Sequence, residues 1–166
     1  MKGYAGSKTE QNIRDLWQTP KAIFNTLNKE FNFVCDVAAS RENRLCKMYF
    51  DEAGNALDPL CDWFKSNWCN PPYSSIMPWV IKAKIEHEKD KTIVMLVPAD
   101  TSVKWFKEAY NSCSEVRFIS GRLAFINAET KKPVSGNNKG SVLFIWRAYC
   151  KSHCVSLIDR CDLERL

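Results

Sequence analysis

A short stretch with two consecutive prolines, Asn70-Pro71-Pro72-Tyr73, constrains the fold of this chain more than any other feature. Proline fixes its own φ and has no backbone N–H, so this stretch can neither continue a central strand nor enter the interior of a helix. It follows the apolar, aromatic run 63–69, and a helical pattern begins soon after it. We therefore predict a rigid loop between the carboxyl end of a buried strand and a helix.

The same loop carries polar atoms that suit a flat, nitrogen-containing ligand. The side-chain oxygen of Asn70 and the carbonyl oxygen of Pro71 are two neutral hydrogen-bond acceptors held close together, and Tyr73 offers an aromatic face beside them. Such a loop can accept both protons of an exocyclic amino group on a planar ring. An ordinary turn is the alternative, because Asn and Pro also form turns for purely local reasons.

Length and composition favour one intracellular domain. The 166 residues can bury a real core, so we predict a single domain over 1–166, with a flexible N-terminus at 1–16 and a C-terminal extension at 148–166. A content of 45% hydrophobic and 26% charged residues is typical of a soluble protein, and no apolar run is long enough to span a bilayer. The N-terminus lacks the apolar segment of a signal peptide, which predicts a cytoplasmic location without a membrane partner.

Eight cysteines raise the alternatives of disulfides and a metal site. Several lie inside apolar strand-like runs, as Cys35 does, and in a reducing compartment they would be small core residues. Cys150, His153, Cys154 and Cys161 are grouped as ligands could be, but structural zinc sites prefer two paired knuckles and only Cys150 and Cys154 are suitably spaced. We therefore expect reduced cysteines and no bound metal.

The hydrophobic patterns alternate between helix and strand along the chain. Helices are predicted over about 20–30, 77–88 and 102–110, and strands over 31–40, 48–50, 92–98, 115–119, 123–126 and 141–147. Thr19 fits the N-cap of the first helix, and Pro20 fits its first position. This order predicts an α/β sandwich with a mostly parallel sheet that finishes in a C-terminal antiparallel hairpin.

Polar and small residues gather where the predicted strands end. Asp36 lies at the carboxyl end of its strand and is followed by Ala38 and Ser40, whose small side chains let a ligand come close to the backbone. In an open α/β sheet this edge faces the ligand crevice. Asn43 and Asp62 are further candidates for polar contacts with a ligand, although such residues in loops often serve only their local backbone.

Three short motifs occur in order: W-x-T-P at 17–20, D-V-A-A at 36–39 and N-P-P-Y-S at 70–74. In this combination the chain resembles the small phage-encoded DNA N6-adenine methyltransferases named after the Dam enzyme. The resemblance extends from Trp17 to about Trp146. One departure is the first motif, which is usually glycine-rich (F-x-G-x-G) in amino-group methyltransferases and contains no glycine here.

The resemblance implies a Rossmann-like methyltransferase fold and transfer of a methyl group from S-adenosylmethionine to the N6 amine of adenine in double-stranded DNA. It implies that the target amine and base are held by Asn70, Pro71, Pro72 and Tyr73. The cofactor would be bound by Trp17, Thr19, Pro20, Asp36, Ala38, Ser40, Asn43, Asp62 and Asn70. The alternatives are methylation of RNA bases or of a protein glutamine, and a catalytically silent DNA-binding module.

Positive charge is concentrated in the last third of the chain. The formal net charge is +5, and residues 115–166 hold 9 Lys and Arg against 5 Asp and Glu, whereas residues 1–114 hold 15 against 14. A polyanionic partner would explain the excess, as would a merely solvated surface. The linker 127–140 is too long and polar for a tight turn. The residues that we predict to bind DNA lie in or near it: Arg122, Lys131, Lys132 and Lys139. A monomer and a homodimer are both compatible with the sequence.

Overall fold

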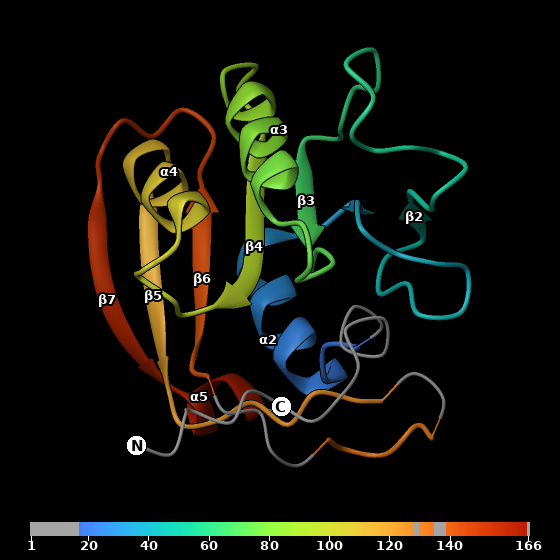
Figure 1. Cartoon of the computed structure of the whole chain (residues 1–166), viewed down its shortest axis with the longest axis vertical. Coiled ribbons are helices and arrows are strands. Elements are labelled where there is room, and N and C mark those ends of the chain that lie inside the picture. Colours follow the sequence, from blue (N-terminus) through green and yellow to red (C-terminus); the bar gives the residue numbers. More distant parts are fainter. Residues whose placement is uncertain (1–16, 128–129, 135–138, 166) are drawn as a thin grey trace, which may run out of the picture.

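Seven strands form one mixed sheet in the order β2-β1-β3-β4-β6-β5-β7 in the computed structural model, which describes residues 17–127, 130–134 and 139–165 (Figure 1). The strands are β1 (Cys35–Asp36), β2 (Met48–Tyr49), β3 (Ser66–Cys69), β4 (Thr92–Pro98), β5 (Glu115–Ser120), β6 (Ser141–Trp146) and β7 (Cys154–Asp159). Neighbouring strands are parallel except where β6 runs antiparallel between β4 and β5. The predicted α/β fold, with a mostly parallel sheet and a late antiparallel pair, is therefore confirmed.

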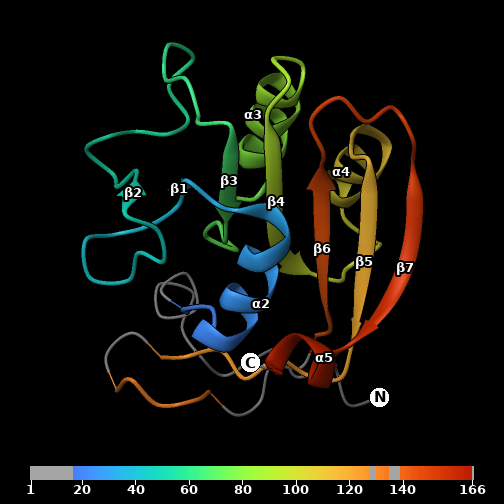
Figure 2. The same ribbon diagram turned by 180° about the vertical axis from the view of Figure 1, so that it is seen from behind.

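Helices cover both faces of the sheet. On one face lie α3 (Met77–His87) and α4 (Lys104–Ser112), and on the other lie α2 (Lys21–Phe31) and α5 (Arg160–Glu164), as Figures 1 and 2 show from opposite sides. All residues of β3 and β6 are buried for this reason. The central strand β4 alternates between the two cores, with Ile93 and Met95 facing α3 and Val94 and Leu96 facing α2.

The first helix has the predicted position but a different start. Its buried stripe of Ile23, Phe24, Leu27 and Phe31 is the one that the spacing of apolar residues predicts. Pro20, however, occupies the N-cap position, and the side chain makes no capping hydrogen bond there. The prediction that Thr19 caps α2 is therefore wrong, and the Thr19 hydroxyl is left buried without a partner among the described residues.

Two predicted strands are shorter or absent. Of residues 31–40, only Cys35 and Asp36 join the sheet, because Asn32 ends α2 with a left-handed φ of 48° and the next residues turn the chain toward the sheet. Segment 123–126 is not a sheet strand either. Its last residue, Ile126, instead forms isolated bridges with Gln18 and Pro133.

The last third of the chain departs most from the prediction. Within the linker 127–140, the Asn127 N–H donates to the Lys132 carbonyl at 2.9 Å, and the Lys131 N–H donates to the Asn127 carbonyl at 3.0 Å. Most of the predicted C-terminal extension is edge strand β7 and helix α5. Leu163 on α5 is buried against the α2 face, which is why this segment stays attached to the domain. The predicted flexible N-terminus, 1–16, lies outside the described residues.

The cysteines lie apart rather than in one cluster. Cys161 comes after the end of β7, whereas Cys154 begins it, and a six-residue strand separates its ends by roughly 20 Å. None of the eight cysteines, all of which the structure describes, forms a disulfide. No metal-binding group of three or more His, Cys, Asp or Glu side chains occurs in the described ranges. None of the helices within those ranges is long and apolar enough to cross a membrane.

Candidate active site

The carboxyl ends of β1 and β3 form the centre of the candidate site. These strands are parallel neighbours, and Asp36 at the end of β1 lies opposite Trp68 in β3. Asn70 follows β3 directly, and its Nδ2 donates to the Trp17 carbonyl at 3.3 Å. The segment before α2 is thereby held against the loop after β3. All three sequence motifs meet at one edge of the sheet.

A small cavity of about 50 Å³ lies between these three segments. Six of the nine residues predicted to bind a cofactor line it: Trp17, Thr19, Asp36, Ala38, Asn43 and Asn70. A larger groove of about 710 Å³ adjoins it and shares Ala38, Asn43 and Pro72 as lining residues. A volume of this order is typical of pockets that bind a small organic ligand.

Four residues around the small cavity have a buried polar atom without a hydrogen-bond partner within the described part of the chain. These atoms are Trp17 Nε1, Thr19 Oγ1, Asp36 Oδ1 and Trp68 Nε1. Folded proteins leave few such atoms unpaired, so each indicates a missing ligand or water. The indole N–H groups are donors suited to a carboxylate, and the aspartate is an acceptor suited to an ammonium group. Together they fit the α-amino acid end of a cofactor.

Asp36 has an unusual protonation equilibrium. One carboxylate oxygen, Oδ2, accepts the Leu45 N–H at 3.1 Å, while Oδ1 has no partner among the residues that the structure describes. Burial raises the pKa of this carboxyl group to about 6, although hydrogen bonds from the Leu45 and Ala38 backbone oppose the shift. A cationic group beside Oδ1 would favour the charged form and lower the pKa again.

Tyr73 is packed more tightly than the sequence suggests. Its hydroxyl is buried and has no partner among the described residues, and burial raises its pKa well above the usual value. The ring contacts Phe125 edge-on, with centroids 6.1 Å apart, and Phe125 in turn stacks on Trp17 at 5.9 Å. The aromatic residue of the double-proline loop is therefore part of a cluster that also supports the small cavity.

Ser40 and Asn43 form a capped turn beside the larger groove. The Ser40 N–H donates to Asn43 Oδ1 at 2.6 Å, and Ser40 Oγ accepts the Asn43 N–H at 3.3 Å. The local role that such residues often have is thus present, and both side chains also line the groove. Pro20 lies next to Thr19 at the start of α2.

Asp62 is not at the site. Its side chain is 68% exposed and pairs with Lys91 at 2.6 Å and Lys89 at 3.0 Å. It precedes β3 and so lies near the amino end of that strand, whereas ligands in open α/β sheets bind at the carboxyl ends. The prediction that Asp62 contacts the cofactor is therefore not supported.

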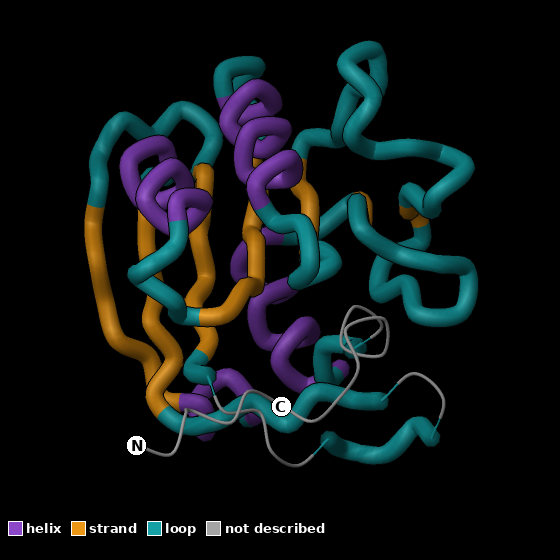
Figure 3. The backbone as a smooth tube through the Cα atoms, in the orientation of Figure 1, coloured by secondary structure: helices purple, strands orange, loops and turns teal. Residues whose placement is uncertain are grey.

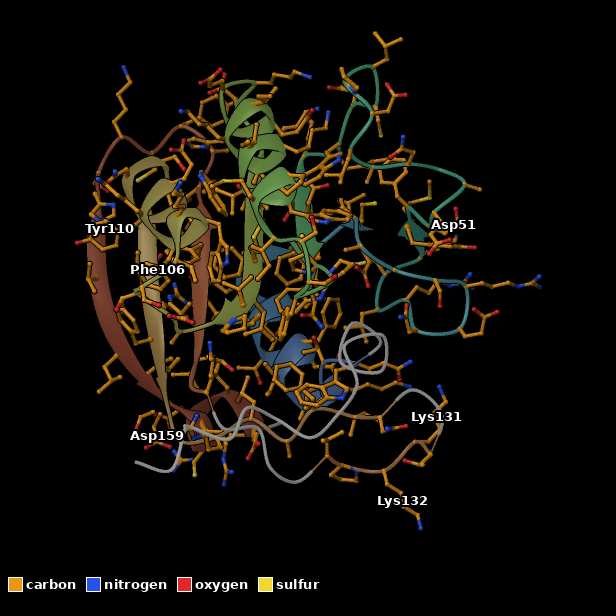
Figure 4. All side chains as sticks on the ribbon, viewed as in Figure 1. Asp51, Phe106, Tyr110, Lys131, Lys132 and Asp159 are labelled. Carbon is orange, nitrogen blue, oxygen red and sulfur yellow. The ribbon has the colours of Figure 1, made fainter. Side chains whose placement is uncertain are left out.

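Sequence reasoning missed most of the wall of the larger groove. The unpredicted residues of this wall include Phe50, Asp51, Ala53, Asn55, Ala56, Leu57 and Trp79. Trp68, which lines the small cavity, is likewise a strand residue for which the sequence predicts no binding role. A signal existed for Asp51, which follows β2 closely and lies in the loop that leaves this strand (Figure 4). An acidic side chain just after the second strand is a common acceptor for ribose hydroxyls in nucleotide-binding α/β folds.

The predicted DNA-binding residues have different surroundings. Lys131 and Lys132 are exposed at the end of a loop that projects from the sheet (Figure 4), whereas Lys139 is ion-paired with Asp100. Arg122 is exposed, and its carbonyl accepts a hydrogen bond from Arg160 at 2.9 Å. Lys131 and Lys132 are thus the clearest candidates for contacts with a polyanion.

Backbone pairing holds this basic loop close to the double-proline loop. Gln18 and Ile126 exchange two hydrogen bonds of 2.9 Å, and the Val134 N–H donates to the Phe125 carbonyl at 2.6 Å. Since Gln18 lies between two cavity-lining residues and Phe125 contacts Tyr73, the loop starts at the site itself.

Two other basic residues of the last third do not add to this surface. Arg117 binds Glu30 with two hydrogen bonds of 2.7 Å, and Arg147 binds Glu30 at 2.9 Å and Glu115 at 3.0 Å. The bonds from Arg117 and Arg147 hold the pKa of Glu30 at about 2 despite partial burial. These arginines therefore stabilise the junction of α2, β5 and β6.

Comparison with known proteins agrees with this geometry. The family model for DNA N-6-adenine-methyltransferase (Dam) matches residues 6–166. The chain belongs to the Dam family. A Dam-family relative, the DNA N-6-adenine-methyltransferase of Escherichia phage T1, is 40% identical over 160 residues, which cover 87% of this chain and 67% of the relative. Another, from Haemophilus phage HP1, is 35% identical over 147 residues, which cover 84% of this chain and 83% of the relative.

Family membership confirms the resemblance carried by the three motifs. It also shows that a chain of this family can lack the glycine-rich first motif. In this Dam-family chain the segment after β1 is D-V-A-A-S, and Ala38, Ala39 and Ser40 line the larger groove. Small side chains at these positions leave the backbone accessible without the conformational freedom of glycine.

Proposed function

We propose that this chain transfers the methyl group of S-adenosylmethionine to the N6 amine of adenine in double-stranded DNA. The observation that carries the proposal is a group of four buried polar atoms, directly beside the loop that begins at Asn70, that have no partner in the part of the chain that the structure describes. They suit the amino acid end of the cofactor, and Asn70 suits the target amine. Membership of the Dam family supports the same activity.

Each part of the cofactor has residues that can bind it. Asp36 would accept hydrogen bonds from the ammonium group, and Trp17 and Trp68 would donate to the carboxylate. The larger groove would take the adenosine, with Asp51 as the acceptor for ribose hydroxyls. When bound, the cofactor supplies a methyl group activated by its sulfonium sulfur.

The double-proline loop would prepare the amine for attack. The Asn70 Nδ2 donates to the Trp17 carbonyl, which leaves Oδ1 available to accept one amino proton while the Pro71 carbonyl accepts the other. These bonds favour the pyramidal nitrogen whose lone pair can attack, so the protein mainly aligns the reacting atoms. The adenine must leave the duplex to reach this loop, and Tyr73 would contact its face.

One assay separates this proposal from its rivals. Labelled cofactor is incubated with duplex DNA, RNA and protein, and the labelled products are digested and identified. We expect N6-methyladenine from duplex DNA. Label in RNA or in protein glutamine would replace the proposed substrate, and absence of both transfer and cofactor binding would indicate a silent DNA-binding module.

Removing two lysines from the basic loop should flatten the salt dependence of DNA binding. Each phosphate contact adds ~0.9 to the magnitude of the log–log salt slope on duplex DNA, so the double variant Lys131→Ala and Lys132→Ala should lose up to about two units. KM for DNA should rise far more than kcat falls, because these contacts supply affinity rather than chemistry. Binding titrations over a range of salt concentrations measure the slope.

The matched control replaces two exposed lysines near the amino ends of β3 and β7, in the double variant Lys65→Ala and Lys151→Ala. It removes the same charge from the opposite edge of the sheet. An equal slope change in both double variants would mean that only net charge matters. An unchanged slope in the loop variant would place DNA on another face.

Tyr73→Phe should be mild. The hydroxyl is buried without a partner among the described residues, so its removal abolishes the cost of burying a polar group without a hydrogen bond. The free energy of unfolding should therefore stay within about 1 kcal/mol of the wild-type value or increase. The aromatic face remains, so kcat should change less than about threefold. Chemical denaturation and steady-state kinetics measure both. A severe loss of kcat with normal stability would show that the hydroxyl gains a partner in the DNA complex.

A further inference from the structure

A buried ionic cluster lies near the C-terminal end of α3, the end of this helix that is away from the carboxyl edge of the sheet. Glu86 has no exposed side-chain surface, and Lys82, one helical turn earlier, is 5% exposed. Their charged groups are 2.8 Å apart, and Glu86 also binds Lys91 at 2.7 Å and Lys89 at 3.1 Å. These hydrogen bonds hold the pKa of Glu86 at about 2 although burial opposes ionisation. The Glu86 carboxylate is therefore charged at neutral pH.

Two members of this cluster bind the backbone of the loop that leads into β3. Glu86 Oε2 accepts the Trp63 N–H at 3.1 Å, and Lys82 Nζ donates to the Cys61 carbonyl at 2.5 Å. Trp63 is itself 2% exposed, and its Nε1 donates to the Ala56 carbonyl at 2.9 Å. The contacts thus run from α3 through Trp63 to Ala56.

That loop is the outer wall of the larger groove. Residues 50–65 connect β2 to β3 and contain neither helix nor strand (Figure 3). Ala56 lines the groove, as does Trp79, whose ring lies 6.4 Å from that of Trp63. The loop's own hydrogen bonds are those of local turns, such as Asn55 N–H to the Asp51 carbonyl at 3.1 Å and Cys61 N–H to the Asp58 carbonyl at 3.0 Å. Local turns do not fix where a long loop lies relative to the helices, so its position depends on the side chains that bind its backbone from outside.

The energetic cost of burying these ion pairs suggests that the cluster has a role other than stabilising the fold. Burying ion pairs is expensive, and well-packed apolar residues in their place often stabilise a protein equally well or better. A cluster that binds Trp63 and Cys61 through fixed hydrogen bonds gives the loop a defined position. We propose that Glu86 and Lys82 are positioning residues that shape the adenosine end of the cofactor groove from outside it, an inference that rests on the proposed function.

The test uses the full chain with Lys82→Met and Glu86→Gln, each a replacement of similar size. Calorimetric titration with S-adenosylhomocysteine gives Kd, and steady-state kinetics on duplex DNA give kcat and both KM values. We expect Kd and KM for the cofactor to rise about tenfold, with kcat at saturating cofactor within about twofold and KM for DNA unchanged.

Two controls separate positioning from stability. Lys84→Met and Glu108→Gln remove an exposed pair, 3.1 Å apart, that joins α3 to α4. Val116→Ala removes a buried methyl pair from β5 and should lower Tm. Neither control should change the Kd of S-adenosylhomocysteine.

The outcomes are distinguishable. Wild-type Kd and KM in both cluster variants would overturn the inference, as would a loss of affinity in Val116→Ala equal to theirs, which would make it an effect of stability alone. If the wild-type chain itself did not bind S-adenosylhomocysteine, the proposed function would fail instead.

Discussion

Asn70→Ala should lower kcat by about a thousandfold while the Kd of the cofactor changes less than about fivefold. Removal of one preorganised polar group that acts mainly in the transition state typically costs about 10²–10³ in rate. Here the variant removes the acceptor of one amino proton, and the adenine is then no longer oriented so that its other amino proton meets the Pro71 carbonyl. Cofactor affinity should survive because Trp17 remains held by the pairing of Gln18 with Ile126 and by its stack on Phe125.

Asn70→Asp is the informative control for this prediction. It keeps a side-chain oxygen for the amine but loses the Nδ2–H bond to the Trp17 carbonyl. A smaller loss of kcat than in the alanine variant would assign the effect to the acceptor. Single-turnover kinetics with preformed enzyme–DNA complex measure the chemical step directly. Near wild-type turnover in Asn70→Ala would show that the amine is held elsewhere.

The predictable parts of the fold are those fixed by local chemistry. The apolar run Thr92–Pro98 is β4 with the predicted bounds, since an unbroken run of β-formers can be buried on both faces only in the middle of the sheet. The observed bounds of α2 and α3 agree with the predicted ones to within about one residue, because apolar spacing and turn residues mark where these helices begin and end. The double proline likewise fixed the loop after β3, because its backbone restrictions do not depend on tertiary contacts.

The parts that were missed depend on contacts between distant segments. Strand β7 is largely exposed and carries no strong alternation, so its place beside β5 is decided by pairing along the whole strand. Asp62 is a polar loop residue of the kind that binds ligands, but Lys89 and Lys91, in the turn between α3 and β4, bind it instead. Thr19 looks like a helix cap, but it lines the small cavity, and its hydroxyl has no partner within the described ranges. Sequence spacing alone does not distinguish these roles.

Replacing Asp36 with asparagine should change the pH dependence of stability. The pKa of Asp36 is about 6 in the folded chain and near 3.8 when unperturbed, so between these values the folded state holds a proton that the unfolded state has lost. The contribution of Asp36 to the free energy of unfolding must therefore fall as pH rises through this window and stay level above it, by about 3 kcal/mol in total. In Asp36→Asn this fall should be absent, and chemical denaturation from pH 4 to pH 8 measures the difference.

The same residue should control cofactor affinity with the opposite sign. The ammonium group prefers the ionised carboxylate, so S-adenosylhomocysteine should bind more tightly as pH rises, by up to about tenfold per pH unit below 6, and level off above it. At pH 7.5, Asp36→Asn should bind about a hundredfold more weakly, because a charged partner is lost in a buried site, and its affinity should not vary with pH. Calorimetric titrations at several pH values compare the two proteins. If the wild-type affinity were independent of pH while the variant was equally weak at all pH values, Asp36 would act by holding the Leu45 backbone in place, and the ammonium group would bind to other acceptors at this edge of the sheet.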